Sequence, residues 1–131
     1  MAEASRKTRI LLVEDDRYLS HACRDALALA DFEVDTSLDG HTALEKMRRT
    51  VPDFVLLDII LPIRNGFEVL EEMRMDEKLK DVPVLIFSNL SQRQDIEKGK
   101  SLGAVDFLVK SDYSMKEIIA RIKEYAAQER K

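Results

Sequence analysis

Four short apolar runs, each ending in a polar residue, constrain this chain more than any other feature of its sequence. The residues that end the runs are Glu14-Asp15-Asp16, Asp58, Ser88 and Lys110. Runs of three or four consecutive apolar residues predict strands that are buried on both faces of a sheet. If these strands are parallel neighbours, their polar ends meet at the carboxyl edge, where open α/β sheets bind ligands. The sequence therefore predicts one site at that edge, with Asp58 at its centre.

Helical patterns and one alternating strand fill the intervals between the runs. Residues 32–36 alternate apolar with polar, which is typical of an edge strand with one wet face. Helices are expected after residues that favour helix starts, and these are Asp15 or Asp16, Asp39, Asn65, Ser91 and Ser114. Five strands alternating with five helices predict a doubly wound α/β fold. Its parallel sheet is covered on both faces, and the flavodoxin-like strand order 2-1-3-4-5 fits.

Two segments have a less regular pattern. The helix expected between Ser91 and Gly103, the fourth, carries only Ile96 as a large apolar residue over residues 92–100. We expect it to pack loosely and to shift easily, with Gly103 at its end. The charged stretch 74–81 is interpreted as a solvated connection.

Length and composition narrow the function classes. A chain of 131 residues with 45% apolar content suits a single domain over 1–131, with its core at about 8–127. The first seven residues lack the apolar core of a signal peptide, and no run approaches the ~20 apolar residues of a membrane span. A net charge of −4 with mixed signs argues against nucleic-acid binding. We expect a soluble, cytoplasmic protein with a protein partner, in which the single cysteine, Cys23, is a buried and inert thiol.

The polar strand ends have a common chemistry. Glu14 and Asp15 would lie beside Asp58, and like charges so close oppose ionisation unless a cation neutralises them. Mg²⁺ is favoured, because it binds a few carboxylates and keeps positions for phosphate oxygens. With Ser88 and Lys110 nearby, this set suits the transfer of a phosphoryl group to Asp58.

At these residues the sequence resembles the response-regulator receiver family of two-component signalling. The matching elements span nearly the whole chain in the family's order and spacing, and they are residues 10–16, 58–66, 83–88 and 103–110. The resemblance implies that Asp58 is the phosphoacceptor and that Glu14 and Asp15 are the acidic pair. It also implies that Mg²⁺ is held by Glu14, Asp15, Asp58 and the backbone carbonyl of Ile60.

The family resemblance further implies a switch and its partners. Ser88 and Lys110 would sense the phosphoryl group, and Ser88 and Phe107 would move to remodel the surface of the fourth helix, fifth strand and fifth helix. A sensor histidine kinase or His-phosphotransfer protein would be the donor, and a downstream protein the target. The chain would be a signalling phosphoacceptor with only self-catalysed chemistry, not an enzyme. A homodimer through the remodelled surface, with Asp106 pairing with Arg121 across it, is left open.

Several residues depart from the family pattern. Ser111 replaces the usual proline after the lysine, so we expect a trans Lys110-Ser111 bond or a strained loop, because a cis bond without proline costs ~2.5–4 kcal/mol. Asn89 replaces a small residue after the hydroxyl, and its amide is a candidate to contact or screen the phosphoryl group. Ile60 and Leu90 occupy the positions that tune hydrolysis in the family. Neither can orient a water, which predicts slow loss of the phosphoryl group.

Three other classes of protein share part of this pattern. A phosphorylation-independent interaction module would keep the fold without the chemistry, and Asn89 and Ser111 leave this alternative open. An aspartyl-phosphate phosphatase needs a general acid near its nucleophile, where this chain has Ile60. A flavin carrier shares the fold.

Overall fold

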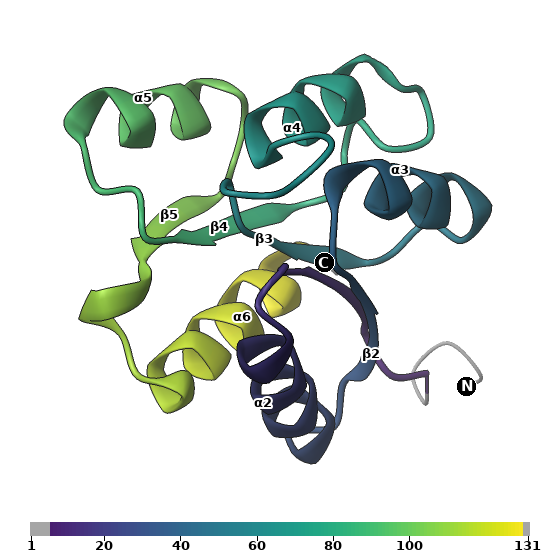
Figure 1. Cartoon of the computed structure of the whole chain (residues 1–131). Helices are drawn as coiled ribbons and strands as arrows, with labels where there is room; N and C mark the ends of the chain where they lie inside the picture. Colours follow the sequence, from purple (N-terminus) through teal and green to yellow (C-terminus); the bar gives the residue numbers. More distant parts are fainter. Residues whose placement is uncertain (1–5, 130–131) are drawn as a thin grey trace.

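A sheet of five parallel strands runs through the middle of the molecule in the computed structural model, which describes residues 6–129 (Figure 1). The strand order is β2-β1-β3-β4-β5, which confirms the order expected from the sequence. Helices α3, α4 and α5 cover one face, and α2 and α6 cover the other. The fold is therefore a flavodoxin-like α/β fold. The strands are β1 (Arg9–Val13), β2 (Glu33–Ser37), β3 (Phe54–Leu57), β4 (Val84–Ser88) and β5 (Asp106–Val109).

The helices begin largely where local capping residues indicate. They are α2 (Arg17–Leu29), α3 (Gly40–Arg49), α4 (Gly66–Met75), α5 (Arg93–Ser101), the 3₁₀ turn η1 (Lys110–Asp112) and α6 (Met115–Glu129). The side chains of Asp16, Asp39 and Asn65 accept the expected capping hydrogen bonds. The expectation for Ser91 was wrong, because Gln92 is the N-cap residue of α5 and makes no side-chain capping bond.

Two apolar cores lie on opposite faces of the sheet. Along β3, Val55 and Leu57 face the core under α3, α4 and α5, while Phe54 and Leu56 face the core under α2 and α6. All four side chains are buried, as the continuous apolar run predicts. The edge strand β2 instead exposes Glu33 and Asp35. These cores fix the strand ends from which the site is built.

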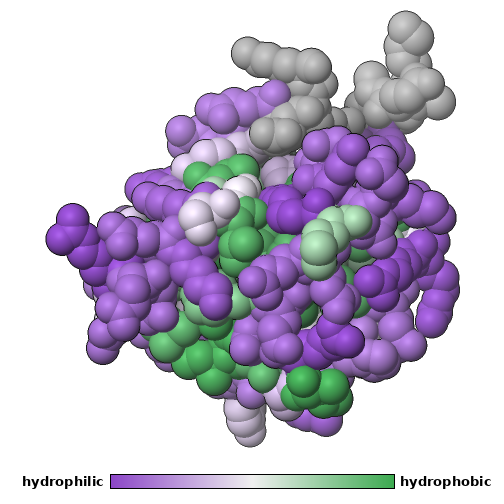
Figure 2. All heavy atoms as spheres, turned by 90° about the horizontal axis from the view of Figure 1, so that it is seen from above, coloured by the Kyte–Doolittle hydropathy of each residue, from purple (hydrophilic) through white to green (hydrophobic). Residues whose placement is uncertain are grey.

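Helix α5 is anchored mainly through a glycine. Gly99 is its one buried residue, and a Cβ atom there would lie 2.7 Å from Ile86 Cδ1 and 2.9 Å from Phe107 Cδ2. Ile96 is only partly buried against the core. The surface over helices α3, α4 and α5 is mostly hydrophilic, with apolar side chains showing in separate small patches (Figure 2). The helix thus has the few apolar anchors that the sequence indicates.

The interpretation of residues 74–81 as a solvated connection was wrong, because Arg74 in this stretch makes several hydrogen bonds to the backbone. Its guanidinium donates to backbone carbonyls at the end of α5 and in the segment that leads to β4, and the acceptors are Leu102, Gly103, Lys80 and Val82, at 2.9–3.2 Å. Leu79, in the same stretch, is fully buried. Because a guanidinium can satisfy several orphan carbonyls at once, Arg74 fastens α4 to the end of α5.

The described part of the chain ends in helix α6. Helix α6 ends at Glu129. Residues 1–5, which belong to the N-terminal segment without the apolar core of a signal peptide, and residues 130–131 lie outside the described part. Within residues 6–129, no helix is both long enough and apolar enough to cross a bilayer.

Candidate functional site

Polar residues from three strands meet at the carboxyl edge of the sheet, as predicted. Glu14 follows β1, Asp58 follows β3, and Lys110 follows β5 at the start of η1. In the register of the sheet, Val13 lies opposite Leu57, so the two carboxylates leave neighbouring strands at the same level. The amide of Asp58 donates to the Val13 carbonyl at 3.0 Å, which continues the hydrogen-bond ladder of the two strands to Asp58.

The ammonium of Lys110 lies between the two buried carboxylates. Its Nζ is 2.5 Å from Glu14 Oε1 and 2.8 Å from Asp58 Oδ2, with the side chains of Lys110, Glu14 and Asp58 only 13%, 4% and 5% exposed. Burial raises the pKa of Glu14, and this effect outweighs the hydrogen bonds from Lys110 and the Asp16 amide. Burial alone would lower the pKa of Lys110, but its two carboxylate partners raise it overall. The single Lys110 ammonium therefore pairs with two buried carboxylates, those of Glu14 and Asp58, which leaves the site with excess negative charge.

Three carboxylates form a cluster that fits a hard divalent cation. Oxygens of Glu14, Asp15 and Asp58 all lie within 4.8 Å of one another, with Asp15 exposed at the rim of the site. Oxygen donors that lack thiolate or imidazole companions suit Mg²⁺ better than zinc or copper. Ile60 lies directly beside the Asp58 carboxylate, because its amide donates to Asp58 Oδ1 at 3.2 Å. The residues present thus fit the expected cation.

The loop that follows β3 packs closely against the backbone of Asp58. The amide of Gly66 donates to the Ile59 carbonyl at 2.8 Å. A Cβ atom at Gly66 would lie 2.3 Å from the Asp58 carbonyl oxygen, so only glycine fits at this approach. The loop and the first turn of α4 therefore hold the backbone of Asp58 in place.

Ser88 and Phe107 lie on neighbouring strands β4 and β5. Ser88 is fully buried, and its hydroxyl accepts a hydrogen bond from the Leu90 amide at 3.4 Å. Phe107 is 6% exposed and lies under Gly99 of α5. Of the two residues expected to act as a switch, Phe107 thus lies where β5 meets α5, and Ser88 ends the neighbouring strand β4. Neither the burial of Ser88 nor this contact could be deduced from a single serine or phenylalanine in the sequence.

The residues that depart from the family pattern are Ser111, Asn89, Leu90 and Ile60. The Lys110-Ser111 peptide is trans, which confirms that expectation. Asn89 is exposed, Leu90 is partly buried against the core, and Ile60 is 53% exposed.

Asp106 and Arg121 pair within one chain. Asp106 Oδ2 accepts from Arg121 Nη1 at 3.1 Å and from the Tyr125 hydroxyl at 2.9 Å. These contacts join β5 to α6 on the surface that was considered for a dimer.

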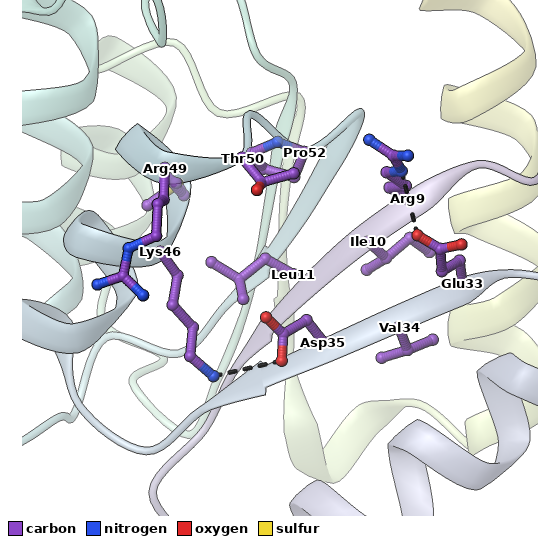
Figure 3. A pocket seen from close by; sticks show the side chains of 11 residues that line it. Arg9, Ile10, Leu11, Glu33, Val34, Asp35, Lys46, Arg49, Thr50 and Pro52 are labelled. Carbon is purple, nitrogen blue, oxygen red and sulfur yellow. Dashed lines mark hydrogen bonds and ion pairs between the residues drawn. The ribbon is translucent and has the colours of Figure 1, made fainter.

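A separate cavity of about 350 Å³ lies between β2 and the end of α3. Four of its five charged side chains form two ion pairs, with Arg9 Nε 3.1 Å from Glu33 Oε2 and Lys46 Nζ 3.2 Å from Asp35 Oδ1 (Figure 3). None of the residues predicted for the site lines it. No single stretch of sequence could indicate this cavity, because its walls come from several elements.

Comparisons with known proteins agree with the geometry. Residues 10–123 match the profile of the response regulator receiver domain. The chain is 35% identical over 115 residues to the "DNA-binding dual master transcriptional regulator RpaA" of Synechocystis sp., covering 88% of this chain and 47% of that protein. It is 37% identical over 115 residues to the "Transcriptional regulatory protein PrrA" of Mycobacterium leprae, covering 88% and 48%. The chain spans about half the length of these relatives.

Solved structures with a similar fold include a receiver domain and a chemotaxis protein. The non-phosphorylated HemR receiver domain from Leptospira biflexa has a TM-score of 0.84 at 32% identity, covering 92% of this chain and 94% of that one. The chemotaxis protein CheY4 of Vibrio cholerae has a TM-score of 0.84 at 26% identity, covering 91% and 98%.

Proposed function

This chain belongs to the response regulator receiver domain family, and from that premise we propose that Asp58 accepts a phosphoryl group from a phosphohistidine. The observation that carries the proposal is the Lys110 ammonium bridging two buried carboxylates at the carboxyl edge. The donor would be a sensor histidine kinase or a His-phosphotransfer protein.

In the proposed transfer, an Asp58 carboxylate oxygen attacks phosphorus and the phosphorus–nitrogen bond of the phosphohistidine breaks. The imidazole leaves with the bonding electron pair, and the product is an aspartyl phosphate. The Ile60 amide and Lys110 hold the two carboxylate oxygens of Asp58, so the nucleophile is oriented before the donor arrives. Lys110 would then contact the incoming phosphoryl oxygens, and the Ser88 hydroxyl would donate to another.

Glu14, Asp15, Asp58 and the Ile60 carbonyl would hold Mg²⁺. The cation would supply charge neutralisation for the phosphoryl oxygens during transfer. The fit rests on the carboxylate cluster and on its excess negative charge over the single Lys110. Slow hydrolysis is proposed as well, because Ile60 and Leu90 cannot orient a water toward phosphorus.

A downstream protein would bind the surface that changes on phosphorylation. A shift of Ser88 toward the phosphoryl group and of Phe107 would change the surface formed by α5, β5 and α6. Support comes from the contact between Phe107 and Gly99 on the sparsely anchored α5. The chain would act in the cytoplasm as a phosphoacceptor with only self-catalysed chemistry, with no direct role on nucleic acid and with homodimerisation through that surface as one form of output.

The proposal is tested by incubating the protein with Mg²⁺ and acetyl phosphate, with Asp58→Asn as the matched control, and weighing both by intact mass spectrometry. We expect the parent alone to gain one phosphoryl group. Gain by neither protein, with Mg²⁺ binding demonstrated separately, would refute the proposal and favour the phosphorylation-independent module. Asn89 and Ser111 would then be the first residues to revert to the family pattern.

A further inference from the structure

Ile63 combines two unfavourable features in the loop that follows the acceptor. Its φ angle is +68°, although β-branched residues rarely occupy the left-handed region. Its side chain is also 76% exposed, although it is apolar. Asparagine at this position would ease the backbone strain and the exposure together. Strain that persists in a folded protein concentrates at functional sites, so this residue calls for a functional explanation.

The backbone of the loop is fixed on both sides of Ile63. The Arg64 amide donates to the Pro62 carbonyl at 2.7 Å, which closes a three-residue γ-turn with Ile63 at its centre. The Arg64 carbonyl lies against the start of α3, where a Cβ atom at Gly40 would come within 2.1 Å of it. The tip of the loop is thus pre-formed.

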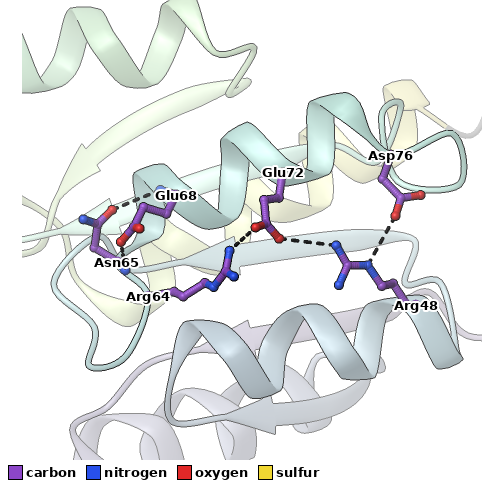
Figure 4. A network of polar contacts seen from close by, with 6 residues as sticks. All are labelled: Arg48, Arg64, Asn65, Glu68, Glu72 and Asp76. Atoms are coloured by element: carbon purple, nitrogen blue, oxygen red, sulfur yellow. Dashed lines mark hydrogen bonds and ion pairs between the residues drawn. The ribbon is translucent and has the colours of Figure 1, made fainter.

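Side chains reinforce this conformation (Figure 4). The Arg64 guanidinium pairs with Glu72 of α4, and Glu72 also pairs with Arg48 of α3 at 3.3 Å. Directly after Arg64, Asn65 and Glu68 form a reciprocal capping box at the start of α4. Both helices therefore hold the loop that presents Ile63 to solvent.

Ile63 belongs to the loop that borders the proposed phosphorylation site. Ile60, whose amide touches the acceptor carboxylate, is three residues away, so their Cα atoms lie within about 11 Å of each other. Ile60 is itself 53% exposed, and Tyr18, three residues after Asp15 at the start of α2, is 91% exposed. Apolar side chains are thus exposed on two of the segments that border the acidic cluster.

The recessed position of the acceptor identifies what would cover these segments. Asp58 is only 4% exposed, so a protein that carries the phosphoryl group on a histidine must press its own surface against the surrounding loops to reach it. We propose that Ile63, supported by Ile60 and Tyr18, is a docking contact for the phosphoryl-donating protein, which presents an apolar patch beside its histidine. This inference rests on the proposed function. Because the loop is already rigid, little conformational entropy is lost at Ile63 when the donor binds. This explains why an isoleucine occupies a strained turn.

The test compares Ile63→Asn with the parent and with Leu29→Asn. Leu29 is an equally apolar residue, 89% exposed at the far end of α2. Each protein is phosphorylated by acetyl phosphate and, separately, by a panel of ³²P-labelled His-phosphotransfer proteins and kinases, from which the fastest donor to the parent is used. For Ile63→Asn we expect kcat/KM with the protein donor to fall about tenfold, from loss of one buried apolar contact. Its rate with acetyl phosphate should stay within about twofold, and its melting temperature should rise by about 2–6 °C.

Each other outcome is decisive. Unchanged transfer from the protein donor would overturn the docking role while leaving the proposed function intact. Equal losses with both donors would also overturn it, since Ile63 would then act on the site itself. If Leu29→Asn also lost transfer, removal of any exposed apolar side chain would slow transfer from the protein donor. That result would count against a docking role specific to Ile63. Failure of the parent to accept from acetyl phosphate would refute the proposed function instead, and failure of every protein donor would refute the docking surface. Ile63→Gly, which also permits the left-handed conformation, should repeat the result.

Discussion

Replacing Lys110 with methionine should destabilise the protein strongly in the absence of divalent cations. Methionine keeps most of the apolar stem of lysine but removes the ammonium that contacts Glu14 at 2.5 Å and Asp58 at 2.8 Å. Removing one partner of a buried ion pair costs about 3–5 kcal/mol, because the remaining charge stays buried. Here two carboxylates, 4% and 5% exposed, lose their shared cation, so we expect a loss of about 3–5 kcal/mol.

The assay is urea unfolding followed by far-UV circular dichroism at pH 7 with EDTA, since the chain has no tryptophan for fluorescence. With an m-value of about 2 kcal/mol/M, the urea midpoint should fall by about 2 M. Lys80→Met is the matched control, because Lys80 pairs with an 88% exposed Glu77 and should contribute under about 1 kcal/mol. A loss in Lys110→Met no larger than that of the control would refute the reasoning that Lys110 neutralises buried carboxylates.

Three further predictions concern other parts of the molecule. Gly66→Ala should lower the free energy of unfolding by about 1–3 kcal/mol, because the new Cβ would lie 2.3 Å from the Asp58 carbonyl oxygen; an unchanged thermal midpoint would contradict this. The Cys23 thiol is 1% exposed and burial raises its pKa to about 11, so at pH 8 its thiolate fraction is about a hundredfold below that of an ordinary thiol. Iodoacetamide should therefore label native protein far more slowly than urea-unfolded protein, and equal rates would show that the thiol is accessible. Ile60→Gln should shorten the lifetime of the aspartyl phosphate about tenfold by orienting a water, as measured by phosphate release; equal lifetimes would remove Ile60 as the cause of slow hydrolysis.

The elements of the fold could be predicted wherever local interactions decide them. The run 54–57 is apolar on both faces and indeed lies between the two cores. Asp39 and Asn65 cap helices through bonds that span three residues, so their role is visible in a short window of sequence. Ser91 failed as a cap because α5 begins later, at Arg93, and gains no side-chain bond at its start.

Long-range contacts escaped prediction. Arg74 was interpreted as solvated because its partners, such as the Leu102 carbonyl, lie 28 residues away. For the site, the convergence of Glu14, Asp58 and Lys110 follows from parallel strands that share a carboxyl edge, so it could be predicted from the ends of the apolar runs. The simultaneous contact of Lys110 with both carboxylates and the left-handed conformation of Ile63 depend on packing that sequence periodicity does not encode.

Phosphorylation of Asp58 is tested most directly by locating the phosphoryl group chemically. Protein treated with Mg²⁺ and acetyl phosphate would be reduced with borohydride, which converts an aspartyl phosphate to homoserine, and then digested and sequenced by tandem mass spectrometry. We predict homoserine at position 58 alone, with none in untreated protein. Reduction at Asp15, Asp16 or any other carboxylate, with position 58 intact, would contradict it.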